Sequence, residues 1–145
     1  MKLIIIRIAG LTGIDENIKY NLDSLKLRKK YCAILIDDTP DMIGMLKKVK
    51  NFVAFGEIDK DALKHLILKR GRVLGDKMID EKKVTESFIN DLIDGKKRMR
   101  DIGAKEFFRL HPPKGGFKKS TKCLYPKGVL GDQGKDINKL LMRML

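Results

Sequence analysis

The sequence predicts an α+β domain built on a β-α-β-α-β core, and three observations support this fold class. Three short runs rich in β-branched and aromatic residues, at 2–9, 31–37 and 52–57, are typical of strands. The segments between these runs carry apolar residues at helical spacing. Finally, 145 residues with a hydrophobic fraction of 43% suffice for one folded domain with one core.

The first strand, at 2–9, is expected to be covered on both faces. Residues 3–6 are an unbroken apolar run, whereas a strand with one solvated face would alternate. The helix expected at 15–27 begins with Asp15 and Glu16, which complement the helix dipole. Its apolar stripe consists of Ile14, Ile18, Leu22 and Leu25.

The second strand, expected at 31–37, leads into a helix with a clear start signal. Thr39 is the expected N-cap and Pro40 the first helical residue, where a missing N–H does no harm. The third strand, at 52–57, completes the β-α-β-α-β order. The apolar stripe of the helix before it consists of Met42, Met45, Leu46 and Val49.

After the third strand the pattern becomes mainly helical. Asp59 is expected to cap a helix that ends at Gly71, in the position where a left-handed residue is common. Residues 73–83 are expected to be a loop, 85–94 a short helix and 104–110 an edge strand.

We expect a single domain over 1–145. The closing helix, at 132–144, should dock on the core through an apolar stripe and so tether the basic segment before it. In chain order, the expected parts are a β-α-β-α-β core at 1–58, a helical extension at 59–103, a basic RNA-binding arm at 104–131 and a C-terminal helix at 132–145.

Positive charge is concentrated in the last third of the chain, whose total net charge is +13. Residues 1–95 carry 18 basic and 15 acidic side chains, and residues 96–145 carry 14 and 4. Such asymmetry points to nucleic acid or to an anionic membrane. A membrane-surface protein would need a helix with a wide apolar face opposite a basic face, and no expected helix has that pattern.

The sequence contains neither a run of about 18 apolar residues nor the pattern of a signal peptide. We therefore expect a cytoplasmic protein with no membrane partner. Its two cysteines, Cys32 and Cys123, should then be reduced thiols.

The most unusual stretch runs from His111 to Lys127. It holds five lysines and no acid, together with three prolines and two adjacent glycines, so it can be neither a long helix nor a central strand. Lysines neutralise phosphates, and the rings of Phe117 and Tyr125 can pack on sugars or bases. This composition favours an extended arm lying over nucleic acid; a solvated basic loop is the alternative.

The remaining basic residues fall into two groups. Those at expected helix ends, such as Arg28 and Lys47, are explained equally well by dipole compensation or by RNA contact. Those from Arg98 onwards have no such explanation. The residues expected to contact nucleic acid are Arg28, Lys47, Lys48, Lys50, Lys69, Arg70, Arg72, Arg98, Arg100, Arg109, His111, Lys114, Phe117, Lys118, Lys119, Lys122, Tyr125 and Lys127.

Catalysis and cofactor binding find little support. His111 is the best general-base candidate, with Cys123 or Asp132 as conceivable partners, but no nucleophile or carboxylate lies near it in sequence. Asp37 and Asp38 resemble a catalytic pair, yet the helix start explains them better. Neither the glycines at 10–13 nor those at 128–134 match a phosphate-loop motif, and the cysteine and histidine spacings do not match a zinc site. We expect no cofactor, no metal and no small-molecule substrate.

Several stretches, in order and nearly end to end, resemble the L-thirty family of large-subunit ribosomal proteins in its longer archaeal and eukaryotic form. Two positions depart from the family pattern. Phe55 stands where the family often has Trp, and Gln133 stands where an Arg is common, so the phosphate contact that the family pattern implies at position 133 is not carried over to this chain. The matching stretches are Ile6–Gly10, Leu25–Arg28, Asp38–Pro40, Gly44–Lys50, Phe55–Asp59, Lys69–Arg72, Phe108–Pro113, Gly116–Lys118, Leu130–Gly131 and Ile137–Asn138.

The resemblance implies ferredoxin-like character, with the core strands in the sheet order 3-1-2. It implies a non-catalytic role in the large subunit, bound to its ribosomal RNA near the 5S RNA and beside other ribosomal proteins. The basic arm would thread between RNA helices and contact phosphates rather than base edges. The alternative is a regulatory RNA- or DNA-binding protein outside the ribosome.

Overall fold

Strand β1 (Lys2–Arg7) lies inside a six-stranded sheet with the order β4-β2-β1-β3-β6-β5. This computed structural model describes residues 2–10, 13, 15–73, 75, 77–125 and 127–145. The other elements are α1 (Glu16–Ser24), β2 (Cys32–Asp37), α2 (Pro40–Val49), β3 (Val53–Glu57), α3 (Lys60–Arg70), η1 (Glu81–Lys83), α4 (Glu86–Asp94), η2 (Met99–Ile102), β4 (Phe107–Arg109), β5 (Ser120–Leu124), β6 (Gly128–Asp132), η3 (Gly134–Asp136) and α5 (Ile137–Met144).

The first three strands and the two helices between them follow the predicted β-α-β-α-β order. Strand β1 pairs antiparallel with both β2 and β3, so these three strands are neighbours in the order β2-β1-β3. Strand β4 extends the sheet beyond β2, as the edge strand that the sequence predicted. On the other side, β6 runs parallel to β3, and β5 pairs with β6 in an irregular register.

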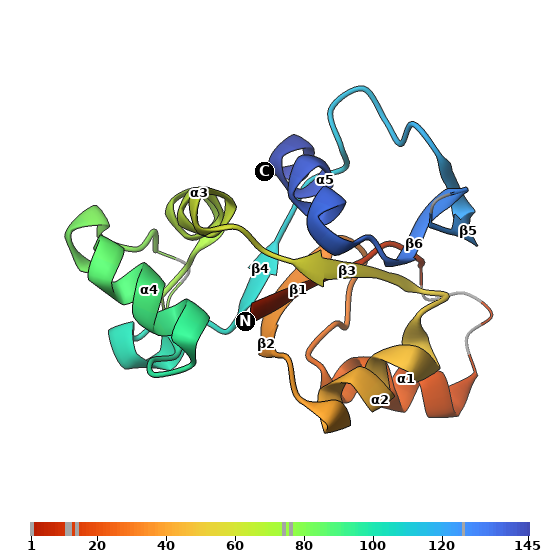
Figure 1. Cartoon of the computed structure of the whole chain (residues 1–145), viewed down its shortest axis with the longest axis horizontal. Helices are drawn as coiled ribbons and strands as arrows, with labels where there is room; N and C mark the ends of the chain where they lie inside the picture. The colour runs from red at the N-terminus through yellow and green to blue at the C-terminus, as the bar shows by residue number, and fades with distance from the viewer. Residues whose placement is uncertain (1, 11–12, 14, 74, 76, 126) are drawn as a thin grey trace.

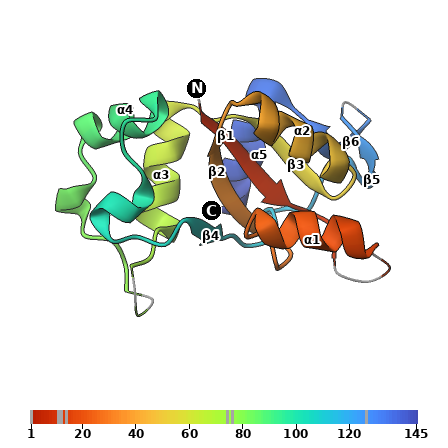
Figure 2. The same ribbon diagram turned by 90° about the horizontal axis from the view of Figure 1, so that it is seen from below.

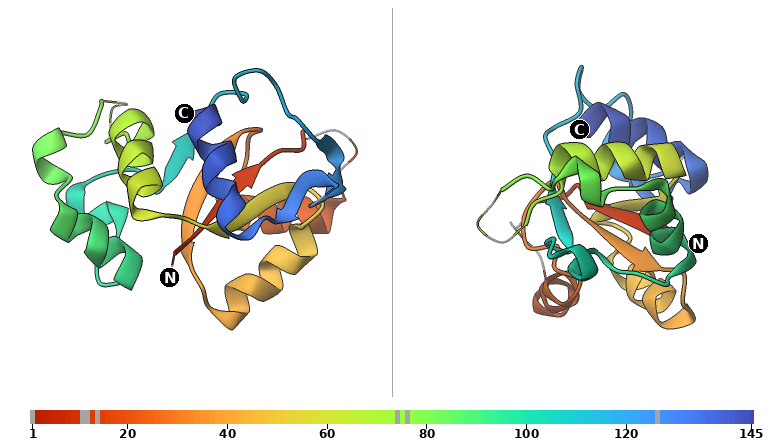
Figure 3. Two further views of the ribbon diagram at one scale, coloured as in Figure 1. Left: turned by 45° about the horizontal axis from the view of Figure 1, so that its top comes forward. Right: turned by 90° about the vertical axis from the view of Figure 1, so that its left-hand side faces the viewer.

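Helices cover the two faces of the sheet as separate layers, as Figures 1 and 3 show. Helices α1 and α2 lie side by side on one face, whereas α3, α4 and α5 belong to the hydrophobic cluster on the other. Every residue of β1 is buried: Leu3 and Ile5 enter the cluster with α1 and α2, and Ile4 and Ile6 enter the other. The prediction of a strand covered on both faces is therefore confirmed.

The local signals at helix starts are also largely confirmed. The Thr39 side chain accepts a hydrogen bond from the Met42 backbone N–H at 3.4 Å, and Pro40 is the first residue of α2. Asp59 precedes α3, but its side chain makes no capping bond; instead its backbone N–H donates to Asn138 Oδ1 at 3.0 Å. The start of α3 is thus fixed by contact with α5.

Two helix ends differ from the prediction. Helix α1 ends at Ser24 rather than residue 27, because Lys26 has a left-handed backbone (φ 61°) and the chain turns there. Gly71 follows α3 in an extended conformation (φ −65°), not a left-handed one. Glycine is needed there for space, since a Cβ would lie 2.4 Å from the Ile67 carbonyl oxygen. Ile14, expected on the stripe of α1, lies outside the described residues.

The largest correction concerns the end of the expected arm. Residues 128–131, expected to be the end of the basic arm, are buried in β6, and this strand pairs with β3 through Gly131 and Asp132. The closing helix correspondingly begins at Ile137 rather than 132, after the short η3 turn. One edge of β3 pairs with β1, and β6 supplies backbone hydrogen-bond partners for the other edge. Figure 2 shows β6 and β5 beside β3, and α3 and α4 at the opposite end of the molecule.

None of the helices in the described part of the chain has the length and hydropathy of a membrane span.

Candidate nucleic-acid interface

The exposed edge of the sheet at β4 carries two adjoining cavities rich in positive charge. The larger, which we call the β4 groove, has a volume of about 620 Å³. The smaller, the β4 pocket, has a volume of about 190 Å³ and is lined by Arg70, Arg72, Lys105, Phe107 and Arg109. The residues that line the β4 groove are Lys26, Arg28, Lys29, Lys30, Cys32, Lys105, Glu106, Phe107, Arg109 and Leu110.

The alternation of side chains along a strand explains why Lys105, Phe107 and Arg109 line both cavities. Phe108 is fully buried in the core, so its neighbours at positions 107 and 109 point the other way, together with Lys105. The Lys105 ammonium and the Arg109 guanidinium each lie 5.9 Å from the centroid of the Phe107 ring. The edge of the sheet therefore presents an aromatic ring between two cations.

Long-range backbone contacts bring two further basic segments to this row. The Lys105 N–H donates to the Arg72 carbonyl at 2.8 Å, which carries the end of α3 to the start of β4. Pairing of Cys32 with Arg109 places the loop at 28–30 on the other side. Arg28, Arg70, Arg72 and Arg109, which the sequence suggested separately, are thus gathered at one edge of the sheet.

Glu106 is the acidic residue among the lining of the β4 groove, and two cations hold it. The Lys26 ammonium donates to one carboxylate oxygen, and Arg100 Nε donates to the other at 2.6 Å. The Lys26 hydrogen bond, opposed in part by burial, keeps the pKa of Glu106 below its ordinary value. Arg100, an expected RNA-contacting residue, therefore forms an ion pair within the protein.

Arg98 and Arg100 line a further cavity of about 410 Å³ with Lys2 and Glu106.

The first residues after β4 are hydrogen-bonded to the end of helix α5. The His111 N–H donates to the Met144 carbonyl and the Lys114 N–H to the Arg143 carbonyl, each at 3.0 Å. In return, Arg143 donates to the Lys114 carbonyl at 3.0 Å and to the Gly116 carbonyl. Pro113 is buried against this junction. We call residues 111–125 the basic segment.

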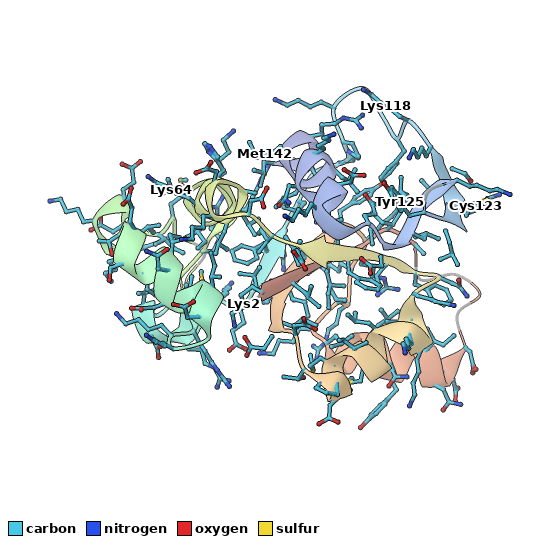
Figure 4. The ribbon with its side chains drawn as sticks, in the orientation of Figure 1. Lys2, Lys64, Lys118, Cys123, Tyr125 and Met142 are labelled. Atoms are coloured by element: carbon cyan, nitrogen blue, oxygen red, sulfur yellow. The ribbon has the colours of Figure 1, made fainter. Side chains whose placement is uncertain are left out.

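The lysines of the basic segment are exposed, and Lys118 lies on the loop between β4 and the edge strand β5 (Figure 4). Within the described part of the chain, no ion pair joins any of these lysines to an acid of the protein. The Lys119 ammonium instead lies 4.8 Å from the centroid of the Tyr125 ring. Their charge therefore remains available to an external anion. The lysines are Lys114, Lys118, Lys119 and Lys122, with Lys127 exposed in the following turn.

The two rings expected to stack on RNA have partners inside the protein. Phe117 is half-buried, packs on the core and stacks on Tyr31 with the ring centroids 6.3 Å apart. The Tyr125 hydroxyl donates to Asp136, and this bond raises the pKa of Tyr125. Phe117 therefore packs within the protein, and Tyr125 is held by a hydrogen bond, neither of which the sequence revealed.

The other expected residues lie apart from the β4 cavities. Lys47, Lys48 and Lys50 are exposed at the end of α2, and Lys69 is exposed near the end of α3. His111 is exposed and lies in neither of the β4 cavities. Among the described residues, no three histidine, cysteine or acidic side chains converge as metal ligands would.

Sequence reasoning missed Lys26, Lys105 and Phe107. A period-2 signal for the latter two is present, because Lys105, Phe107 and Arg109 alternate with the apolar Phe108 and Leu110. Lys26 carries no comparable signal, since its place beside β4 depends on the turn after α1.

Comparison with known proteins finds relatives over nearly the whole length of the chain. The sequence model of the family described as ribosomal protein L30p/L7e matches residues 3–53. The chain is 38% identical to the large ribosomal subunit protein uL30 of Archaeoglobus fulgidus, over 97% of each chain. It is 37% identical to the uL30 of Methanobrevibacter smithii, covering 98% of this chain and 99% of the relative. With the uL30 of Aeropyrum pernix the identity is 38%, over 97% of each chain.

Proposed function

Because the chain belongs to the ribosomal protein L30p/L7e family, and so is a structural constituent of the large ribosomal subunit, we propose that it acts by binding large-subunit ribosomal RNA. Its role is to hold RNA in place rather than to catalyse a reaction. It works in the cytoplasm as part of the ribosome, in association with other large-subunit proteins.

The observation that carries this proposal is the excess of positive over negative charge along the β4 groove and the basic segment. Among the described residues that line the β4 groove, six are cationic and one, Glu106, is acidic. The lysines of the basic segment have no ion-paired acid among the described residues. Cations in excess of the acids around them, held by a rigid fold, attract phosphates, and the release of counterions from RNA supplies affinity.

The parts of the chain are proposed to divide this work. The core at 1–58 and the helical extension at 59–103 form the scaffold, and the C-terminal helix fastens the base of the basic segment. The basic segment would lie between RNA helices, close to the 5S RNA, and contact phosphates and shape rather than base edges. We also infer ferredoxin-like character for the core, supported by two helices on one face of the antiparallel β2-β1-β3 strands.

Binding of large-subunit RNA measured against salt concentration tests the proposal. If six to ten phosphates are neutralised, affinity should fall by about 10³-fold to 10⁵-fold between roughly 50 and 200 mM salt. A salt-independent affinity, or no binding at low salt, would contradict it. Sedimentation of cell extracts distinguishes a ribosomal constituent, which migrates with large subunits, from a free regulatory RNA-binding protein, which does not.

A further inference from the structure

The cavities at β4 differ from the rest of the basic surface because an aromatic ring lies between them. Phe107 lines both the β4 groove and the β4 pocket, whereas Phe117 and Tyr125 are occupied by partners of their own. Part of the Phe107 ring packs against the cluster with α1 and α2, which holds it in position. The two neighbouring cations are 5.9 Å from its centroid, close to the outer limit of a cation–π contact. A flat apolar ligand can therefore approach this ring at little cost.

The β4 pocket has the composition of a phosphate site. Of the five described residues that line it, four are cationic and none is acidic. Its volume of about 190 Å³ equals that of roughly six molecules of liquid water, which suits a hydrated phosphate and not a whole nucleoside.

One polar atom beside this pocket lacks a partner. Among the described residues, Arg70 Nε is the buried side-chain nitrogen or oxygen that makes no hydrogen bond. A buried donor without a partner costs free energy, so the Arg70 side chain is held at the pocket without its full set of hydrogen bonds. Arg72, by contrast, already donates to the Gly71 carbonyl at 3.0 Å, which orients its guanidinium.

The β4 groove has the size and the chemistry to accept a base. Its volume of about 620 Å³ lies within the range of roughly 300–1,000 Å³ typical of small-ligand sites. Phe107 supplies apolar surface to its wall beside the cations, whereas Cys32 and Leu110, which also line it, are buried. An RNA duplex keeps its bases stacked and its major groove closed, so a recessed ring can meet a base only where the RNA is unpaired.

We propose that the β4 cavities bind one unpaired nucleotide of the ribosomal RNA, with its phosphate in the β4 pocket and its base stacked on Phe107. This inference rests on the proposed function and narrows it to a bulged or looped-out nucleotide at a defined site. An acidic peptide could supply negative charge to the β4 pocket but has no base to stack on Phe107, so the site should favour RNA over such a peptide.

The test compares protein-free large-subunit RNA with inorganic polyphosphate, which carries phosphates and no base. Phe107→Leu keeps an apolar side chain but removes the π face, and should weaken RNA binding roughly 5-fold to 100-fold. Its affinity for polyphosphate should stay within about twofold of wild type. Arg72→Gln should weaken both ligands and reduce the slope of log affinity against log salt by about one. Phe107→Tyr, which keeps the ring, should bind RNA like the wild type.

Phe52→Leu is the matched control, because Phe52 is half-buried in the same cluster and lines neither β4 cavity. Equal RNA binding by Phe107→Leu and wild type, or an equal loss in Phe107→Leu and Phe52→Leu, would overturn the inference. So would an equal loss of RNA and polyphosphate binding in Phe107→Leu. Each of these results leaves the proposed function intact, whereas failure of the wild-type protein to bind RNA would end both.

A second measurement needs no variant. Irradiation of the wild-type complex at a wavelength that excites bases should cross-link an unpaired nucleotide to the peptide that contains Phe107. A complex whose cross-links all lie in other peptides would overturn the site.

Discussion

Arg7 Nη1 donates a hydrogen bond of 2.6 Å to the backbone carbonyl of Leu27 inside the protein. Only 1% of Arg7 is exposed, and its Nε donates to the Ala9 carbonyl at 3.1 Å. Burial lowers the pKa of the guanidinium, although the negative charge of Asp23 opposes this effect. The bond ties the central strand to the turn that leads into the basic residues at 28–30.

Arg7→Met should therefore destabilise the fold. Removal of the guanidinium leaves the buried Leu27 carbonyl without a partner, which costs about 1–3 kcal/mol in the free energy of unfolding. Urea denaturation measures the loss. Arg28→Met, at an exposed position nearby, is the control and should change stability by less than about 0.5 kcal/mol. Similar stabilities for the two variants would show that the buried bond contributes little.

Gly56→Ala should disrupt the contact between β3 and the C-terminal segment. A Cβ at position 56 would lie 2.1 Å from the Gly134 carbonyl oxygen and 2.8 Å from Ile137 Cγ2. Such overpacking of a core typically costs about 1–3 kcal/mol or more. Thermal unfolding should show a lower midpoint.

The same substitution at Gly44, inside α2, supplies the control. No atom lies within 4 Å of a Cβ built there, and alanine favours a helix interior over glycine by about 1 kcal/mol. Gly44→Ala should therefore be neutral or stabilising. A loss as large as that of Gly56→Ala would mean that the overlap with Gly134 and Ile137 does not explain the effect in β3.

The elements that the sequence predicted correctly are those with strong local signals. Strand β1 is an uninterrupted apolar run, and the starts of α2 and α4 carry threonine caps whose side chains accept backbone hydrogen bonds. Strand β6 was missed because its apolar part is only Val129 and Leu130 between glycines, which reads as a turn. Its burial depends on pairing with β3, more than 70 residues earlier in the chain.

The candidate site was predictable only in part for the same reason. Basic residues can be counted from sequence, but which of them share a cavity depends on tertiary contacts. Arg72 reaches β4 through a backbone bond to Lys105, and a bridge between Val73 and Ala104 supports it. Neither contact leaves a periodic signal in the sequence, so the pocket around Phe107 could not be anticipated.

Stability should depend on Glu106 in a pH-dependent way. Its pKa is lowered in the folded state, first by the Lys26 hydrogen bond, so the ionised carboxylate stabilises the fold. This contribution is complete above the ordinary value of 4.5 and is lost as the pH falls through the lowered folded value. Glu106→Gln should be less stable than wild type at pH 7 by less than about 1 kcal/mol, and the difference should vanish in acid.

The same variant should bind RNA more tightly. Glu106→Gln releases Lys26 and Arg100 from their ion pairs at the mouth of the β4 groove. The slope of log affinity against log salt should become steeper by up to about two. Glu57→Gln removes one negative charge from a residue without an ion pair in the described part of the chain, and controls for net charge. A gain in Glu57→Gln equal to that in Glu106→Gln would assign the effect to net charge alone.

The two cysteines should differ in reactivity. Burial raises the pKa of the Cys32 thiol, although the Arg109 charge opposes this, whereas Cys123 is exposed on β5. Iodoacetamide should therefore modify Cys123 in the folded protein and Cys32 only after denaturation. Mass spectrometry of the labelled peptides distinguishes the two, and RNA should slow the labelling of Cys123 if the basic segment contacts it. Rapid labelling of Cys32 in the native state would contradict its burial.

The lysines of the basic segment should contribute to RNA affinity and not to folding. Replacement of Lys114, Lys118, Lys119 and Lys122 by Gln breaks no ion pair among the described residues, so the thermal midpoint should change little. The slope of log affinity against log salt should fall by about 0.9 for every phosphate that is no longer neutralised, up to about four phosphates. Filter binding over a range of salt concentrations measures this change.

An equal reduction of charge elsewhere separates local contact from general attraction. Lys19, Lys60, Lys64 and Lys82 are exposed on α1, α3 and η1, and Figure 4 shows Lys64 at the opposite end of the molecule from Lys118. Their replacement by Gln removes the same net charge and should leave the slope almost unchanged. If both quadruple variants lost the same affinity, the basic segment would act only through the total charge of the protein. If instead the first variant unfolded, its lysines would have a structural role that the absence of ion pairs does not reveal.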